Sequence, residues 1–138
     1  MNSEQTNSLI QIGEMTIRVV VADDLIQSFE ASMPRSGLGP GLHLHTGMDE
    51  IFYVKAGKVR ITSGDSVVVA SAGEIVRVPR MTPHQWQSVD GPAEMLFTFI
   101  PGQNQVGYLR ELAELSNSGR SWDEGIAALQ NKYDNRPL

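Results

Sequence analysis

The sequence predicts an all-β domain, either an antiparallel sandwich or a barrel, followed by two short helices. Two observations lead to this prediction. Between residues 9 and 102 the chain consists of short runs rich in valine, isoleucine, threonine and aromatic residues, and several of these alternate between apolar and polar side chains, as strands with one buried face do. Clusters of glycine, proline, aspartate and serine separate these runs, and no helical periodicity intervenes.

The N-terminal part is expected to contain an unstructured lead and two strands. Residues 1–8 are mostly polar and offer little to bury against the entropy lost on ordering, so we expect a disordered lead. Residues 15–22 and 29–33 alternate with the two-residue period of a strand, and the second run brings Met33 to the same face as its other apolar residues.

Five further strands are expected between residue 51 and residue 100, because each apolar run there is bounded by turn-forming residues. Alternation places Phe52 on the inward face of the first of these strands, and Phe97 and Phe99 together on one face of the last. The strands are expected at residues 51–54, 59–62, 67–70, 75–78 and 93–100, and the turns at 56–58, 63–66, 71–74 and 90–92.

The chain after residue 102 changes to helical periodicity. Apolar residues recur at helical spacing over residues 108–115, and Gly119 is suited to end that helix. Residues 121–124 have the sequence of a capping box, which predicts a second helix running towards Tyr133. Because the pattern is an ordinary amphipathic one, it favours a structural cap packed on the barrel over a catalytic lid.

Length and composition restrict the class of protein. A chain of 138 residues fits one domain with a sizeable core. The net charge of −5 and the scattered basic residues argue against nucleic acid or an anionic membrane as a partner. The chain has no cysteine, no signal-peptide pattern at its start and no apolar run long enough to cross a bilayer, so we expect a cytoplasmic protein.

All three histidines occur with one glutamate in a pattern suited to metal binding. His43 and His45 are two residues apart, so on an extended strand both imidazoles point to the same face. Glu50 follows a polar, glycine-containing segment that can turn the chain back towards them. The remaining histidine, His84, directly follows Pro83, which restricts the backbone there. One histidine alone would more often be a surface or core residue, but together the four side chains predict a site for one divalent transition metal ion, Fe, Mn, Ni, Cu or Zn.

These residues resemble the two motifs of the cupin superfamily. The first motif is matched at every fixed position by Gly37, His43, His45, Glu50 and Gly57. The second motif is matched by Gly73, Pro79 and His84, with Met81 in place of a glycine and Ser88 in place of an asparagine. Neither of the two departing positions is a metal ligand in cupins.

The resemblance implies a more specific fold than the strand pattern does. It implies a double-stranded β-helix, or jelly roll, over residues 9–102, preceded by the lead at 1–8 and followed by a helical extension, 103–138, packed on the barrel. The four ligands of such a barrel would be His43, His45, Glu50 and His84. The alternative is a cupin that keeps these residues but works without metal.

Aromatic and methionine side chains are expected near the ligands and predict a substrate pocket, although inward-facing residues of these types often belong to the core. Such an interior suits a flat, largely apolar ligand with a few oxygens. Arg35 and Arg77 are expected to be solvated or ion-paired rather than bound to an anionic substituent. The predicted pocket residues are Met33, Phe52, Trp86, Phe97 and Phe99.

Several segments resemble the small single-domain cupins grouped with quercetin 2,3-dioxygenase: residues 39–45, 49–54, 97–102, 108–113 and the closing residues 132–138. The resemblance implies a dioxygenase acting on an aromatic or polyketide-like molecule, in which Glu50 is both metal ligand and proton acceptor. A zinc cyclase or isomerase that needs no oxygen, and a non-catalytic small-molecule-binding cupin, are the alternatives. Cupins often dimerise through their sheets, so we expect a homodimer with residues 15–22 as a contact.

Overall fold

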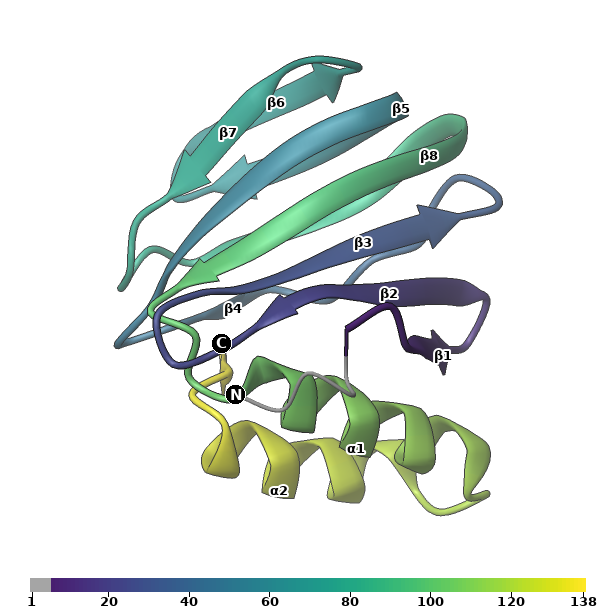
Figure 1. Cartoon of the computed structure of the whole chain (residues 1–138), viewed down its shortest axis with the longest axis vertical. Coiled ribbons are helices and arrows are strands. Elements are labelled where there is room, and N and C mark those ends of the chain that lie inside the picture. Colours follow the sequence, from purple (N-terminus) through teal and green to yellow (C-terminus); the bar gives the residue numbers. More distant parts are fainter. Residues whose placement is uncertain (1–5) are drawn as a thin grey trace.

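A computed structural model describes residues 6–138 and shows a β-barrel with two helices along one side (Figure 1). The strands of the described chain form one nine-stranded hydrogen-bonded sheet that curls over on itself. The predicted all-β jelly roll with two C-terminal helices is confirmed. The elements are β1 (Leu9–Ile12), β2 (Met15–Ala22), β3 (Gln27–Met33), β4 (His43–Leu44), β5 (Asp49–Ser63), β6 (Ser66–Ser71), β7 (Ile75–Val78), β8 (His84–Ile100), α1 (Gln105–Asn117), α2 (Trp122–Lys132) and β9 (Arg136–Pro137).

Two of the predicted turns were wrong, because they are bends inside long strands. The chain stays in β5 through residues 56–58 and in β8 through residues 90–92, and the two strands pair along their whole length with register shifts near Ala56. Gly57 has a φ of 73°, and a Cβ added there would lie 2.2 Å from the Pro92 carbonyl oxygen. A left-handed residue serves a tight turn and a β-bulge equally well, so the sequence alone did not distinguish them.

The core lies between the inward faces of the long strands. Side chains alternate between buried and more exposed along most of β3, β5 and β8, apart from the bends at residues 55–58 and 89–92, and Phe29, Phe52 and Met95 are completely enclosed. The rings of Phe29 and Phe97 lie 5.4 Å apart between centroids. A side chain that alternation directs inward is therefore surrounded by apolar neighbours, except at the end of the barrel where the histidines lie.

The N-terminal segment runs beside β2. Of the predicted disordered lead, residues 1–5 lie outside the described residues, whereas Asn7 donates its backbone N–H to the Val19 carbonyl at 2.7 Å. Strand β2 pairs with β1 on one side and with β3 on the other. Both of its backbone edges are paired over residues 16–19, so a homodimer contact at those residues would have to use outward-facing side chains. The dimer stays a prediction.

The C-terminal extension differs from the barrel in how it packs. Helix α1 buries four residues, whereas α2 buries none. Ser121 is the N-cap of α2, but its side chain makes no capping hydrogen bond, so the predicted capping box is not formed. After α2 the chain returns to the barrel, where β9 pairs with β4. Neither helix of residues 6–138 has the length and hydropathy required to cross a membrane.

Candidate metal centre and cavity

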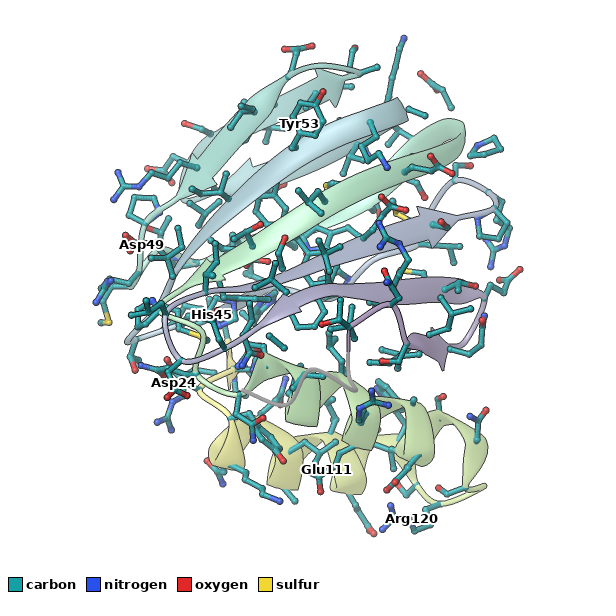
Figure 2. The ribbon with its side chains drawn as sticks, viewed as in Figure 1. Asp24, His45, Asp49, Tyr53, Glu111 and Arg120 are labelled. Atoms are coloured by element: carbon teal, nitrogen blue, oxygen red, sulfur yellow. The ribbon has the colours of Figure 1, made fainter. Side chains whose placement is uncertain are left out.

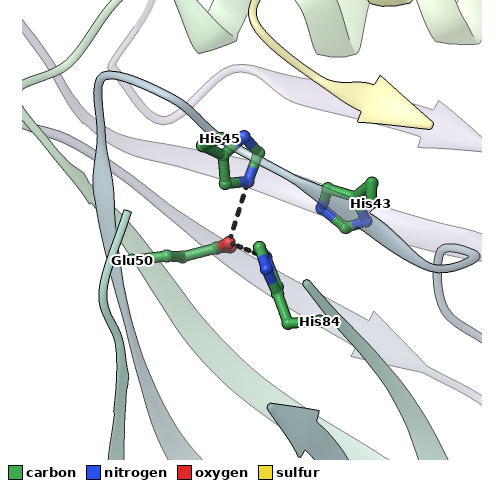
Figure 3. A group of neighbouring side chains, drawn as sticks. All are labelled: His43, His45, Glu50 and His84. Carbon is green, nitrogen blue, oxygen red and sulfur yellow. Dashed lines mark hydrogen bonds and ion pairs between the residues drawn. The ribbon is translucent and has the colours of Figure 1, made fainter. Parts of the chain in front are cut away.

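The structure brings the four predicted ligands together at one end of the barrel (Figure 3). His43 lies on β4, His45 just after it, Glu50 near the start of β5 and His84 at the start of β8. His43 and His84 are directly paired across β4 and β8. One nitrogen or oxygen atom from each of the four side chains lies within 4.8 Å of all the others, and all four residues are buried. The geometry is that of a site that could hold one metal ion.

Each imidazole is oriented by a backbone carbonyl. The Nδ1 atoms of His43, His45 and His84 lie 2.7, 2.9 and 2.9 Å from the carbonyl oxygens of Gly41, Asp134 and Thr82 respectively. A carbonyl can only accept, so each Nδ1 carries the proton and donates it. This fixes the tautomer of the neutral ring and leaves the Nε2 lone pair available for a metal, as in protein metal sites generally.

Distances within the cluster match those between ligands of one ion. Glu50 Oε1 lies 3.2 Å from His45 Nε2 and 2.9 Å from His84 Nε2. Two atoms that each bind one ion at about 2.1 Å and at right angles lie about 3 Å apart. The same contacts act as hydrogen bonds when the imidazoles are protonated. These two distances therefore already suit ligands of one ion.

Burial and charge set the ionisation of the cluster. Burial opposes the charged form of Glu50, but hydrogen bonds from His45 and His84 outweigh it and lower the pKa of the carboxyl to about 2. Burial, with the nearby charge of His84, lowers the pKa of His43 to about 4. Burial lowers the pKa of His45, but the hydrogen bond to Glu50 outweighs this effect, so the pKa is raised overall. At neutral pH the cluster therefore contains a carboxylate and a neutral His43, both in the form that binds metal.

A cavity of about 420 Å³ opens onto the cluster. Its floor contains His43 and Glu50, its sides come from β1, β2 and the loop before β4, and its roof is formed by α1 and α2. Among the residues of the described chain that line it, none is lysine, arginine or aspartate. The wall is mainly aromatic and aliphatic, so the cavity suits a neutral and largely apolar molecule.

The predicted pocket residues divide into two groups. Trp86, Phe97 and Phe99 line the cavity. Phe52 and Met33 do not line it, because both are completely buried in the core further from the opening. The ring of Phe52 still contacts the lining, since its centroid lies 6.3 Å from that of Trp86.

The two arginines considered as ligand-binding residues are ion-paired outside the cavity. Arg35 pairs with Glu14, and Arg77 lies 3.3 Å from Asp49, whose carboxylate also accepts from Arg80. Figure 2 shows Asp49 at the outer edge of the barrel, whereas His45 lies on the side of the helices. The prediction that Arg35 and Arg77 are ion-paired is confirmed.

Comparison with known families decides the identity of the fold. The model of the cupin domain matches residues 29–99. The chain belongs to the cupin family. This span contains all four proposed ligands of the cupin, and the predicted family is confirmed, whereas the quercetin dioxygenase-like subgroup stays a prediction.

Solved structures similar to this cupin share its fold at low sequence identity. KdgF from Halomonas sp. is 18% identical with a TM-score of 0.66, over 77% of this chain and 94% of its own. An RmlC-like cupin from Shewanella frigidimarina NCIMB 400 is 19% identical with a TM-score of 0.66, over 77% and 93%. Streptomyces Pac13, a nucleoside dehydratase, is 19% identical with a TM-score of 0.59, over 76% and 83%. No curated protein matches the sequence.

Both departures from the second cupin motif have structural explanations. Met81 occupies the glycine position in the left-handed conformation, with a φ of 67°, and donates its backbone N–H to the His45 carbonyl at 2.7 Å. Ser88 occupies the asparagine position, is fully buried, and donates its hydroxyl to the Arg35 carbonyl at 2.7 Å while accepting from the Leu38 N–H. Both positions support the loops beside the ligands, and neither reaches the cluster.

Sequence reasoning missed the residues that the C-terminal extension contributes. Asp134 supplies the carbonyl that orients His45, and Gln105 and Asn135 are buried polar residues that also line the cavity. Asp134 and Asn135 stand in a short polar segment after α2 that has no periodicity. Their roles arise from contacts with residues far away in the sequence, so no local signal could have revealed them.

Proposed function

We propose that this cupin is a metal-dependent oxygenase of the dioxygenase type that acts on a neutral, aromatic or polyketide-like small molecule. One observation carries the proposal. Three oriented imidazoles and one carboxylate cluster at the base of an apolar cavity, whose lining includes His43 and Glu50 and, within the described chain, no lysine or arginine. A buried charged cluster of this kind at the base of an apolar cavity is typical of a functional site.

The donor set fits one divalent transition metal ion. Imidazole nitrogen and carboxylate oxygen suit Fe, Mn, Ni, Cu and Zn, and the carbonyls that hold the three Nδ1 atoms leave the Nε2 atoms free to bind. His43, His45, Glu50 and His84 would hold the ion. When bound, a redox-active ion would supply the redox chemistry that an oxygenase needs.

Glu50 has the position and charge to accept a proton from the substrate. It is the only carboxylate among the described residues that line the cavity, and its lowered pKa keeps it ionised at neutral pH. A hydroxyl group of the substrate that approaches the floor would meet Glu50 and His43 first. We propose that Glu50 both holds the metal and takes this proton.

The residues in the wall of the cavity favour an uncharged aromatic or polyketide-like substrate. Trp86, Phe97 and Phe99 offer aromatic surfaces for a flat ring. Burial raises the pKa of the Tyr108 hydroxyl to about 12, so this lining residue stays neutral and can donate a hydrogen bond to a substrate oxygen. A phosphate or a carboxylate would find no positive side chain to replace its lost hydration.

Oxygen consumption tests the proposal. The protein is loaded separately with Fe, Mn, Ni, Cu or Zn, and oxygen uptake is measured with a panel of hydroxylated aromatic and polyketide-like compounds. We expect substrate-dependent uptake with at least one redox-active metal. Glu50→Gln should lower the rate by at least about 100-fold, the usual range for loss of a general base. Asp49→Asn is the matched control, because it changes the adjacent carboxylate, which faces outward and pairs with Arg77 and Arg80.

Other outcomes would replace the proposal with one of its alternatives. Turnover that persists without oxygen in the zinc-loaded protein would favour a cyclase or isomerase. The fold accommodates non-oxidative chemistry, since Pac13 is a nucleoside dehydratase. Binding without turnover under any metal would favour a small-molecule-binding cupin. Equal loss of activity in Glu50→Gln and Asp49→Asn would contradict the role of Glu50.

A further inference from the structure

The carbonyls that orient the three ligand histidines differ in how far they lie from those histidines in the sequence. The carbonyls that accept from His43 and His84 belong to residues two positions earlier, Gly41 and Thr82. The carbonyl that accepts from His45 belongs to Asp134, 89 residues later. The barrel strands therefore orient two imidazoles by themselves, whereas the third depends on the C-terminal extension.

Asp134 also fixes the turn that follows His45. Its carboxylate accepts from the backbone N–H of Thr46 at 3.0 Å, from the Thr46 hydroxyl at 2.6 Å and from the backbone N–H of Gly47 at 2.9 Å. This turn leads directly to Glu50. One residue of the tail thus holds the ring of one ligand through its backbone and the connection to a second ligand through its side chain.

Asp134 is itself held in place by buried contacts. Strand β9 pairs with β4, with Arg136 opposite Leu44, and Figure 3 shows this strand beside the one that carries His43. The Asn135 amide donates to Gln105 Oε1 at 3.3 Å, and Gln105 donates to the Tyr133 carbonyl at 3.0 Å. Both amides are buried, so breaking this connection would leave polar groups without partners.

We infer that Asp134 is a positioning residue of the metal centre, and that metal binding and docking of the C-terminal segment stabilise each other. The inference rests on the proposed metal site. Residues that hold the second nitrogen of a ligand histidine typically change metal affinity when they are replaced. Because the coupling of two equilibria is reciprocal, an ion that holds His45 in place also favours the docked position of Asp134.

Titration of the metal-free protein with Co(II) tests the inference by affinity and by absorption spectrum. Asp134 has a φ of 57°, so Asp134→Gly removes the carboxylate without backbone strain. The carbonyl behind His45 remains in this variant, but the turn from His45 to Glu50 loses its hydrogen bonds to the carboxylate. We expect this loss to weaken Co(II) binding about 10- to 100-fold and to alter the visible spectrum of the bound ion. Asp90→Gly is the matched control, because Asp90 has a φ of 59° and is exposed on β8.

A conservative variant separates positioning from folding. Asp134→Asn keeps one acceptor oxygen and tolerates the left-handed conformation, so it should retain more of the affinity than Asp134→Gly. Partial rescue of this kind supports the inference. Should both variants bind Co(II) within twofold of Asp90→Gly, the inference is overturned while the metal centre stands. Failure of the unsubstituted protein to bind Co(II) would overturn both.

Hydrogen exchange provides the reciprocal measurement. In the unsubstituted protein, Co(II) should slow amide exchange over residues 133–136 by at least about tenfold, the same order as the change in affinity. In Asp134→Gly this protection should be much smaller. Equal exchange of these amides with and without Co(II) in the unsubstituted protein would contradict the coupling.

Discussion

The barrel and the C-terminal helices of this cupin use their apolar residues differently. In the barrel, Phe29, Phe52 and Met95 are completely enclosed by other side chains of the protein. In α2 no residue is buried, and Trp122 and Ile126 face the cavity instead. The apolar side chains of the barrel therefore stabilise the fold, whereas those of α2 remain available to a ligand.

The two regions therefore contribute different parts of the site. Strands β4, β5 and β8 carry the four proposed ligands or lead directly to them, and the helices provide the opposite wall of the cavity. Changes in the barrel core should act on stability, and changes in α2 should act on ligand binding. Three predictions test this division, beginning with the largest expected effect.

Phe52→Ala should destabilise the protein by about 3–5 kcal/mol, because it opens a cavity in a closed core. Urea unfolding measures the free energy directly. Trp122→Ala removes a larger ring from α2, yet we expect it to change stability by no more than about 1 kcal/mol, since 45% of Trp122 is exposed. Equal destabilisation by the two substitutions would contradict the contrast between barrel and helix.

Ile126→Ala should weaken the binding of an apolar ligand by about fivefold, because it removes apolar surface from the roof of the cavity. The neutral fluorescent probe N-phenylnaphthylamine reports this affinity in a titration. Leu129→Ala is the matched control: it removes the same number of carbon atoms from the same helix, but Leu129 does not line the cavity. If Leu129→Ala weakened binding as much, the effect would come from helix stability rather than from the wall.

Glu30→Gln should have the smallest effect, under about 1 kcal/mol, because it changes an ion pair on the outer face of the barrel. A hydrogen bond from Lys55, opposed by partial burial and aided by Arg18, lowers the pKa of Glu30 below 4.5. The stabilisation is present above that value and is lost as the pH falls through the lower, folded-state pKa. The variant should therefore show a shallower loss of stability in acid.

The control for this measurement is Glu124→Gln, which changes an exposed carboxylate on α2. Thermal unfolding is followed between pH 3 and pH 7 for both variants, and only the change in slope that Glu30→Gln shows beyond Glu124→Gln is attributed to the ion pair. A steeper acid dependence in Glu30→Gln would mean that the ion pair on β3 does not lower the pKa as its contacts indicate.

The sequence predicted the features that depend on local periodicity. Alternation identified the inward faces of β2, β3, β5 and β8, and the spacing of the histidines identified the cluster that the structure brings together. Alternation gives the face of a residue but not its depth in the barrel. For this reason Phe52 could not be separated from Trp86, although only Trp86 lines the cavity.

The features that were not predicted depend on contacts distant in sequence. The bend at Gly57 is a bulge because β8 continues beside it, and the pairing of β9 with β4 joins the last strand to the ligand strand. Helical periodicity likewise showed that α2 has an apolar stripe, but not that this stripe faces a cavity. Asp134 lies in no periodic segment, so its contact with His45 emerged only from the folded chain.

The three backbone carbonyls behind the imidazoles restrict how this centre could change during evolution. A carboxylate replacing His43, His45 or His84 would direct an oxygen towards a carbonyl oxygen that needs a donor. A change of ligand at any of these positions would therefore require a compensating change in the main-chain path behind it. Glu50 Oε1 instead contacts the imidazoles of His45 and His84, so the backbone favours histidine at the other three positions independently of any metal.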